Sequence, residues 1–157
     1  MKKVLFICSF LILQSTFSQD IVGKWKIISD RTKHINSLIE IYKKDNLYYG
    51  KILLLPNKKN IDKCQSCKGK YHNVDLKGLE ILTNLEKTKE KLYENGKVLD
   101  PENNKTYSCY IQLLTKDKLK IRGYIGFSIF GRTQYWYRLD KNEETKLLQQ
   151  LTKTKIK

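Results

Sequence analysis

Two groups of residues in this chain have types and a spacing that could do chemistry. The first is a dense polar cluster whose members lie within five positions: Asp100, Glu102, Asn103 and Asn104. Carboxylate and amide oxygens at such spacing are typical of an EF-hand calcium loop, which also needs Gly at its sixth position and a bidentate acid at its twelfth. Counted from Asp100, those positions hold Lys105 and Ile111, so the calcium pattern fails.

The same cluster has the chemistry of a turn. Pro101 presets the second residue of a turn, and flanking Asp and Asn side chains bond to their own backbone. We therefore interpret Asp100 and Pro101 as structural residues between two strands.

The second group is a set of cysteines. Cys64 and Cys67 are separated by two residues in a long polar stretch, residues 56–78, without a strand pattern. In an oxidising compartment the leading interpretation is a local disulfide between them. Three alternatives stay open: a zinc site formed by Cys64, Cys67, His72 and Cys109, a redox pair, and free thiols. Cys109 alternates with Ile111 and Leu113, which indicates burial as a small hydrophobic side chain.

Catalytic machinery is not evident in the sequence. The two imidazoles, His34 and His72, lie in polar connecting segments without a partner that the sequence can position. The chain contains no P-loop, nucleophile elbow or Gly-rich dinucleotide turn. We assign no catalytic residue, metal or cofactor, and an esterase that uses one of the histidines is only a third-ranked hypothesis.

Residues 1–18 have the layout of a secretory signal peptide. Lys2 and Lys3 precede an apolar core from residue 4 to residue 13, and small polar residues follow to Ser18. This core is too short to span about 30 Å of hydrocarbon, so cleavage after Ser18 is favoured over an uncleaved anchor. We expect an exported protein, periplasmic or secreted, that has lost Cys8 with the peptide.

The remaining residues are strongly basic. Of the 31 basic residues, Lys2 and Lys3 leave with the peptide, so 16 acidic residues leave a net charge of +13. Only four of the basic residues are Arg, which suits bidentate recognition of bases and phosphates better than Lys. We therefore exclude nucleic acid as a partner, and expect at most loose contact with an anionic envelope surface.

Alternating apolar and polar residues predict an antiparallel meander. Strand patterns cover residues 23–29, 37–44, 46–56, 105–114, 118–127 and 131–140, and turns are expected at Asp45-Asn46 and Lys116-Asp117. Residues 91–94 and 97–100 flank Asn95-Gly96, the pair typical of a tight hairpin. Seven to nine strands in up-and-down order predict an all-β sandwich or closed barrel over residues 19–140. Residues 141–157 form a basic tail, either a short helix with Leu147, Leu148 and Leu151 on one face or a disordered end.

One strand pattern carries the residues of a candidate binding face. In residues 131–139, alternation places Arg132, Gln134, Trp136 and Arg138 on one side. If that side points into a barrel, its aromatic ring and positive charge suit an amphipathic anion. If it points outward, it is an ordinary solvated face, because parity alone does not distinguish the two.

Several motifs resemble an exported bacterial family known as domain of unknown function (DUF) 2147. They occur in the family's order: Gly23-Lys24-Trp25-Lys26, residues 48–52, residues 76–82, residues 96–107, residues 121–126 and the segment that begins at Gly131-Arg132. The resemblance implies a lipocalin-like β-barrel. It also implies that Gly23 and Trp25 are structural, with Trp25 at the barrel base covered by Arg138 or Arg132, and that Gly131 is structural.

These observations lead to two hypotheses from different classes. The first is an exported lipocalin-like barrel that binds a small hydrophobic or amphipathic molecule without chemistry, with Trp136, Arg132, Arg138 and Tyr124 as ligand contacts. Such sites combine apolar walls with a few placed polar groups. The second is an envelope structural or interaction protein whose barrel is filled by its own side chains.

Overall fold

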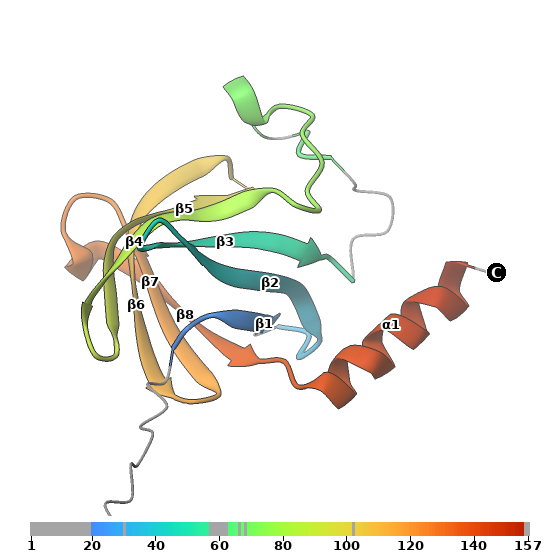
Figure 1. The fold of residues 1–157 in the computed structure, drawn as a ribbon. Helices are drawn as coiled ribbons and strands as arrows, with labels where there is room; N and C mark the ends of the chain where they lie inside the picture. The colour runs from blue at the N-terminus through green and yellow to red at the C-terminus, as the bar shows by residue number, and fades with distance from the viewer. Residues whose placement is uncertain are drawn as a thin grey trace, which may run out of the picture.

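The computed structural model describes residues 20–29, 31–56, 63–65, 67, 69–101 and 103–155. Eight antiparallel strands follow one another in chain order around a closed barrel, and one helix follows the last strand (Figure 1). The strands are β1 Gly23–Ile28, β2 Ile35–Lys44, β3 Leu47–Leu54, β4 Glu80–Lys89, β5 Leu92–Asp100, β6 Lys105–Thr115, β7 Lys118–Tyr124 and β8 Gly131–Arg138. Two 3-10 turns, η1 Gly69–Tyr71 and η2 Ser128–Phe130, and the helix α1 Lys141–Lys155 complete the elements. The predicted all-β antiparallel meander is confirmed, whereas the expected signal peptide lies outside the described residues.

The connections fall into two sets at opposite ends of the barrel, because neighbouring strands are antiparallel. Tight turns join β2 to β3, β4 to β5 and β6 to β7 at one end, which we call the hairpin end. The other four connections lie at the opposite end, the loop end. Asp45 and Asn46 join β2 to β3 with φ angles of 49° and 65°, as the predicted turn requires.

The predicted hairpin at Asn95-Gly96 is wrong. Both residues lie inside β5, and the hairpin between β4 and β5 is formed by Glu90 and Lys91. Asn95 has a φ of 61°, and the register against β6 shifts between Tyr93 and Gly96. The positive φ that Asn tolerates is thus used for a β-bulge, in which one strand carries an extra residue, and not for a turn.

Most of the fully buried interior side chains lie in the half of the barrel next to the hairpin end. Two indoles and a phenol, those of Trp25, Trp136 and Tyr93, are the largest fully buried side chains. Aliphatic side chains that are also buried surround them: Ile39, Ile41, Leu82, Leu85, Ile111, Leu113 and Leu119. Alternation along each strand directs these side chains to a common interior, as expected for a barrel of this size.

One part of the buried apolar core lies against the outer wall of the barrel. Leu82 pairs with Val98 across β4 and β5, so their sequence neighbours Ile81 and Leu99 point to the opposite face. Both are nevertheless buried, at 7% and 6% exposure. They belong to one buried cluster with four residues of the connection between β3 and β4: Cys64, Cys67, Leu76 and Leu79. This connection therefore covers part of the outside of the barrel.

The tail forms a helix with a defined start. The backbone N–H of Glu143 donates to Asp140 Oδ1 at 2.8 Å, and the Glu143 carboxylate lies 3.5 Å from the Asp140 N–H, which is a capping box. Glu143 and Glu144 pair with Lys26 and Lys24, on the outer face of β1. The side chains of Leu148 and Leu151 lie outside the description, so the expected apolar face stays a prediction. In the described part of the chain, no helix is both long and apolar enough to span a bilayer.

Candidate functional site

The inner face of β8 forms a column of decreasing burial from the hairpin end to the loop end. Trp136 is 1% exposed and pairs with Leu119 of β7, so its side of the strand points into the barrel. Gln134 is half-buried, and its Oε1 lies 3.4 Å from the Trp136 Nε1. Arg132 is exposed and is the last inward-facing residue of the strand. Among the described residues, no hydrogen bond or ion pair engages its guanidinium.

Neighbouring strands supply an apolar wall beside this column. Arg132 pairs with Gly123, and Gly123 pairs with Cys109 of β6. A side chain at Gly123 would begin 3.4 Å from Val98 Cγ1 and 3.5 Å from Tyr107 Cβ. The absence of a side chain here leaves Val98 and Tyr107 as the inward surface next to Arg132. Both are half-buried, unlike the fully buried residues at the hairpin end.

Arg138 closes the hairpin end and does not join this column. Its three donor groups bond to backbone carbonyls: Nε to Lys116 at 2.7 Å, Nη1 to Val22 at 2.9 Å and Nη2 to Asp20 at 2.8 Å. Its central carbon lies 4.2 Å from the centroid of the Trp25 ring, an arrangement for a cation–π interaction. Burial lowers the pKa of Arg138, and the carboxylates of Asp117 and Asp20 oppose that change. Of the two arginines expected to cover Trp25, Arg138 does so, and this leaves it unavailable to a ligand at the loop end.

Gly23 makes that arrangement sterically possible. Its φ is 134°, and a Cβ atom at this position would lie 2.7 Å from Arg138 Nη1. Trp25, two residues later, donates its Nε1–H to the Ile21 carbonyl at 2.8 Å. Gly23 leaves room for the Arg138 guanidinium, and the Trp25 ring packs against it. Both residues of the Gly-X-Trp motif thus help to connect the start of β1 to the end of β8.

Sequence reasoning missed Asp20, which organises the same end of the barrel. The Tyr93 hydroxyl donates to its Oδ1 and the Tyr48 hydroxyl to its Oδ2, both at 3.1 Å. The two tyrosine rings meet edge to face with centroids 4.9 Å apart. Burial, reinforced by the Asp20 carboxylate, raises the pKa of Tyr48 to about 12 and also raises that of Tyr93. A lone Asp before the first strand carries no sequence signal for this contact.

Tyr124, expected among the interior contacts, lies on the outer face of the barrel. Its neighbour Gly123 faces inward opposite Arg132, and alternation therefore turns Tyr124 outward. Tyr124 pairs with Gly131, the first residue of β8. A Cβ atom at Gly131 would lie 2.6 Å from the Gly123 carbonyl oxygen, so this position requires glycine.

The polar cluster at residues 100–104 is a turn, as predicted. Asn103 donates its Nδ2–H₂ group to Asp100 Oδ2 and to the Tyr107 hydroxyl, each at 2.9 Å. Its Oδ1 accepts the Lys105 backbone N–H at 2.9 Å, which closes an Asx turn. Glu102 lies outside the described residues. The cluster therefore connects β5 to β6 and fixes Tyr107 at the loop end.

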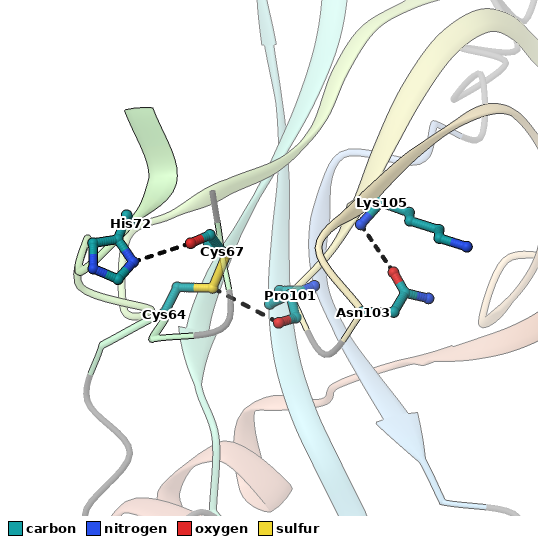
Figure 2. The surroundings of a disulfide bond; sticks show 6 residues. All are labelled: Cys64, Cys67, His72, Pro101, Asn103 and Lys105. Atoms are coloured by element: carbon teal, nitrogen blue, oxygen red, sulfur yellow. Dashed lines mark hydrogen bonds between the residues drawn. A yellow bond between two sulfur atoms is a disulfide. The ribbon is translucent and has the colours of Figure 1, made fainter. Parts of the chain in front are cut away.

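The cysteine pair lies in the connection that covers the outer wall. Cys64 and Cys67 are at disulfide-bonding distance, with Cα atoms 5.3 Å apart, and Cys64 Sγ lies 3.7 Å from the Pro101 carbonyl oxygen (Figure 2). His72 Nδ1 lies 3.1 Å from the Cys67 carbonyl oxygen. Cys109 is fully buried inside the barrel, and burial raises its pKa to about 12. Within the described residues, no three His, Cys, Asp or Glu side chains are grouped to hold a metal ion, so the zinc alternative has no support there.

Two other features lie apart from the β8 column. His34 and His72 are exposed on separate connections. A groove of about 490 Å³ lies outside the barrel where α1 leaves β8, lined by Lys26, Ile28, Asp117, Tyr137, Arg138, Asp140 and Glu143. Its Lys26 and Glu143 already pair with each other, and its Arg138 is bonded to backbone.

Comparison with known proteins supports the fold and the family. The protein HP1028 of Helicobacter pylori, described as belonging to the lipocalin family, superposes with a TM-score of 0.72 at 21% sequence identity. The match covers 82% of this chain and 88% of HP1028. At that identity the likeness establishes the lipocalin-like fold alone. No curated protein sequence matches the chain. Residues 23–138 match the family described as "Uncharacterized protein conserved in bacteria (DUF2147)", and the chain therefore belongs to the DUF2147 family.

Proposed function

We propose that this protein is exported and binds one small amphipathic anion at the loop end of its barrel, without chemistry. The single observation that supports this proposal is the β8 column. Trp136 forms an apolar floor, Gln134 offers a half-buried polar group above it, and Arg132 holds a positive charge at the rim. A ligand with an apolar tail and a negative head group matches this order.

The apolar wall formed by Val98 and Tyr107 supports the same ligand orientation, with the tail inside the barrel and the head group at the rim. Val98 and Tyr107 lie 3.4 and 3.5 Å from the position that a Cβ atom of Gly123 would take, next to Arg132 on the neighbouring strand. A tail placed there would remove these half-buried surfaces from water, which contributes about 25 cal/mol per Å² of apolar area. Because the hairpin half of the barrel is already filled, a ligand reaches only as deep as Trp136. We therefore expect a short or partly buried tail.

The filled hairpin half also supports a second candidate function. A barrel of eight strands is narrow enough to be filled entirely by its own side chains. In that case the protein acts in the cell envelope through its surface, as a structural or interaction protein. The two candidates differ in one property, saturable binding of a small molecule.

Tryptophan fluorescence tests the proposal directly, because the chain contains only two tryptophans. Decanoate is titrated into the wild type and into the single-tryptophan variants Trp25→Phe and Trp136→Phe. We expect saturable change in the variant that retains Trp136 and none in the variant that retains Trp25, since Trp25 lies at the hairpin end. Decylamine, with the opposite head-group charge, should bind at least about tenfold more weakly.

Matched charge-removing variants test the ligand contact that we assign to Arg132 at the rim of the barrel. Arg132→Gln should weaken decanoate binding about tenfold, because a charge-assisted pair is lost. Lys116→Gln removes a charge from a side chain that is 76% exposed in the turn between β6 and β7, at the hairpin end, and should leave binding unchanged. Absence of saturable binding by the folded wild type, for decanoate and for a total lipid extract, would reject the carrier function in favour of the second candidate.

A further inference from the structure

The most exposed large apolar side chains of the described residues lie together in one short connection. Ile125 is 64% exposed, Phe127 79%, Ile129 75% and Phe130 79%. All four belong to residues 125–130 between β7 and β8, which we call the apolar loop and which includes η2 (Figure 1). The other exposed large apolar side chains are dispersed over the chain and are only 36% to 45% exposed.

Specific bonds hold the apolar loop in its shape. The Arg122 side chain, on β7, donates from Nε to the Ser128 carbonyl at 2.6 Å and from Nη2 to the Ile129 carbonyl at 2.9 Å. Its Nη1 donates to Thr133 Oγ1 of β8 at 2.8 Å. The Phe130 N–H donates to the Phe127 carbonyl at 3.1 Å. One arginine thus joins both strands to the loop while the apolar side chains point away from the protein.

This bonding pattern suits an environment with little water. Backbone carbonyls that enter the apolar part of a bilayer must be satisfied within the protein, since each unsatisfied group costs several kcal/mol. The carbonyls of Phe127, Ser128 and Ile129 already have donors. A large apolar patch that is exposed to water usually marks a site where a membrane or another protein binds.

The charge around the apolar loop favours an anionic partner. Two basic residues, Arg122 and Arg132, flank the apolar loop on its two strands, and no acidic residue lies between them in the chain. Anionic lipid attracts such a surface by about 1 kcal/mol per basic residue near it. A second copy of this chain, with a formal net charge of +15, would be repelled instead.

We infer that the apolar loop docks this protein on anionic lipid bilayers, with the side chains of Ile125, Phe127, Ile129 and Phe130 in the interface. Arg122 holds the loop in its shape, and the exposed Arg132 adds positive charge at the rim beside it. The docking does not depend on a ligand inside the barrel. It orients the loop end, where the proposed ligand site lies, toward the bilayer.

Vesicle co-sedimentation with the full-length mature protein tests the inference. The wild type should bind vesicles that contain phosphatidylglycerol and bind pure phosphatidylcholine vesicles much more weakly. The double variant Phe127→Ser/Phe130→Ser should lose about tenfold or more of that binding, because two buried rings are removed. Leu114→Ser removes an apolar side chain that is 37% exposed at the hairpin end, and should bind as the wild type does.

A fluorescence readout separates insertion from loose electrostatic attraction. Phe130→Trp adds an indole to the loop, and brominated acyl chains should quench it, whereas Trp25 and Trp136 are buried in the barrel. Equal vesicle binding by the double serine variant and the wild type, or no quenching of the new indole, would overturn the inference. Concentration-dependent dimers that require Phe127 and Phe130, without vesicle binding, would assign the loop to a second copy and also overturn it. Decanoate binding in the absence of vesicles is a separate measurement, so failure of either proposal is recognised independently.

Discussion

The guanidinium of Arg138 lies over the indole of Trp25, with its central carbon 4.2 Å from the ring centroid. The same guanidinium bonds to the carbonyls of Asp20, Val22 and Lys116, so it joins the segment just before β1, the turn between β6 and β7, and the end of β8. One side chain thereby covers the barrel base and connects its first strand to its last. This relationship leads to the first two predictions.

Arg138→Gln should lower the free energy of unfolding by about 2 to 4 kcal/mol, because the charge-assisted bonds and the ring contact are lost together. Urea denaturation followed by circular dichroism measures the change. Arg132→Gln is the matched control, since it removes an exposed arginine from the same strand and should change stability by less than about 0.5 kcal/mol. If the two substitutions lowered the free energy of unfolding equally, the contacts of Arg138 at the barrel base would not contribute specifically to stability.

Gly23→Ala should destabilise the protein by about 1 to 3 kcal/mol, because the new Cβ meets Arg138 Nη1 and the positive φ is strained. Part of that cost is a clash with one side chain. In an Arg138→Ala background the substitution should therefore cost less than it does in the wild type. A double-mutant cycle measures the difference, and strict additivity would contradict the contact.

Alkaline pH should weaken the fold through the tyrosines that bond Asp20. The pKa of Tyr48 is raised from 10.0 to about 12 in the folded protein, whereas the unfolded chain releases this proton near its ordinary value. The unfolded state then binds fewer protons, so this contribution to stability is complete below pH 10 and is lost as pH rises toward 12.

Urea unfolding at about pH 8 and about pH 11 tests this contribution. Tyr48→Phe should lose less stability between the two pH values than the wild type does. Tyr135→Phe, at an exposed position on the outside of β8, should show the wild-type loss. If the Tyr48 variant and the wild type lost the same stability between the two pH values, Tyr48 would not contribute to the loss.

Thiol counting should distinguish the cysteines. Without reductant the folded protein should react slowly with Ellman's reagent, because Cys109 is buried and its pKa is raised to about 12. In a protein prepared without residues 1–18, which include Cys8, unfolding should release one thiol per chain, and reduction should release the two thiols of Cys64 and Cys67. Three thiols on unfolding without reductant would exclude the disulfide.

The capping box of α1 should stabilise the start of that helix but not the barrel. Asp140→Ala removes the oxygen that accepts the Glu143 N–H, which typically costs a helix about 1 kcal/mol. Amide hydrogen exchange in residues 141–147 should become about fivefold faster. Global urea unfolding should change little, because the helix contacts the barrel through the half-exposed pairs of Lys24 and Lys26 with Glu144 and Glu143. Asn142→Ala, without a capping role, is the control.

Much of the architecture could be predicted from local sequence chemistry. Alternation marked six of the strands, and Asp45-Asn46 marked its turn correctly because few residues accept positive φ. β4 was missed: beyond Leu85 its residues are polar on both faces, so the two-residue period disappears there. Asn95-Gly96 misled for a related reason, since a β-bulge demands the same φ as a hairpin turn.

The candidate site could be predicted only in part. Alternation grouped Arg132, Trp136 and Arg138 on one face, and the structure shows that this face points inward. Alternation alone did not show that β8 runs from one end of the barrel to the other. Arg138 therefore lies at the base and Arg132 at the rim, although both are on the same face of the strand. Asp140 and Glu143 had the spacing of a capping box, a signal that sequence reasoning could have used.

The sequence by itself determined the strand pattern, the turn at residues 100–104 and the motifs of a DUF2147 barrel, because these depend on neighbours along the chain. Only the tertiary structure decided which face of each strand is interior, which arginine covers Trp25, and that Asp20 accepts two tyrosine hydroxyls. Arg138 and Trp25 are 113 positions apart in the chain, and Asp20 and Tyr93 are 73 positions apart. Closure of the barrel brings them together, and no local period encodes it.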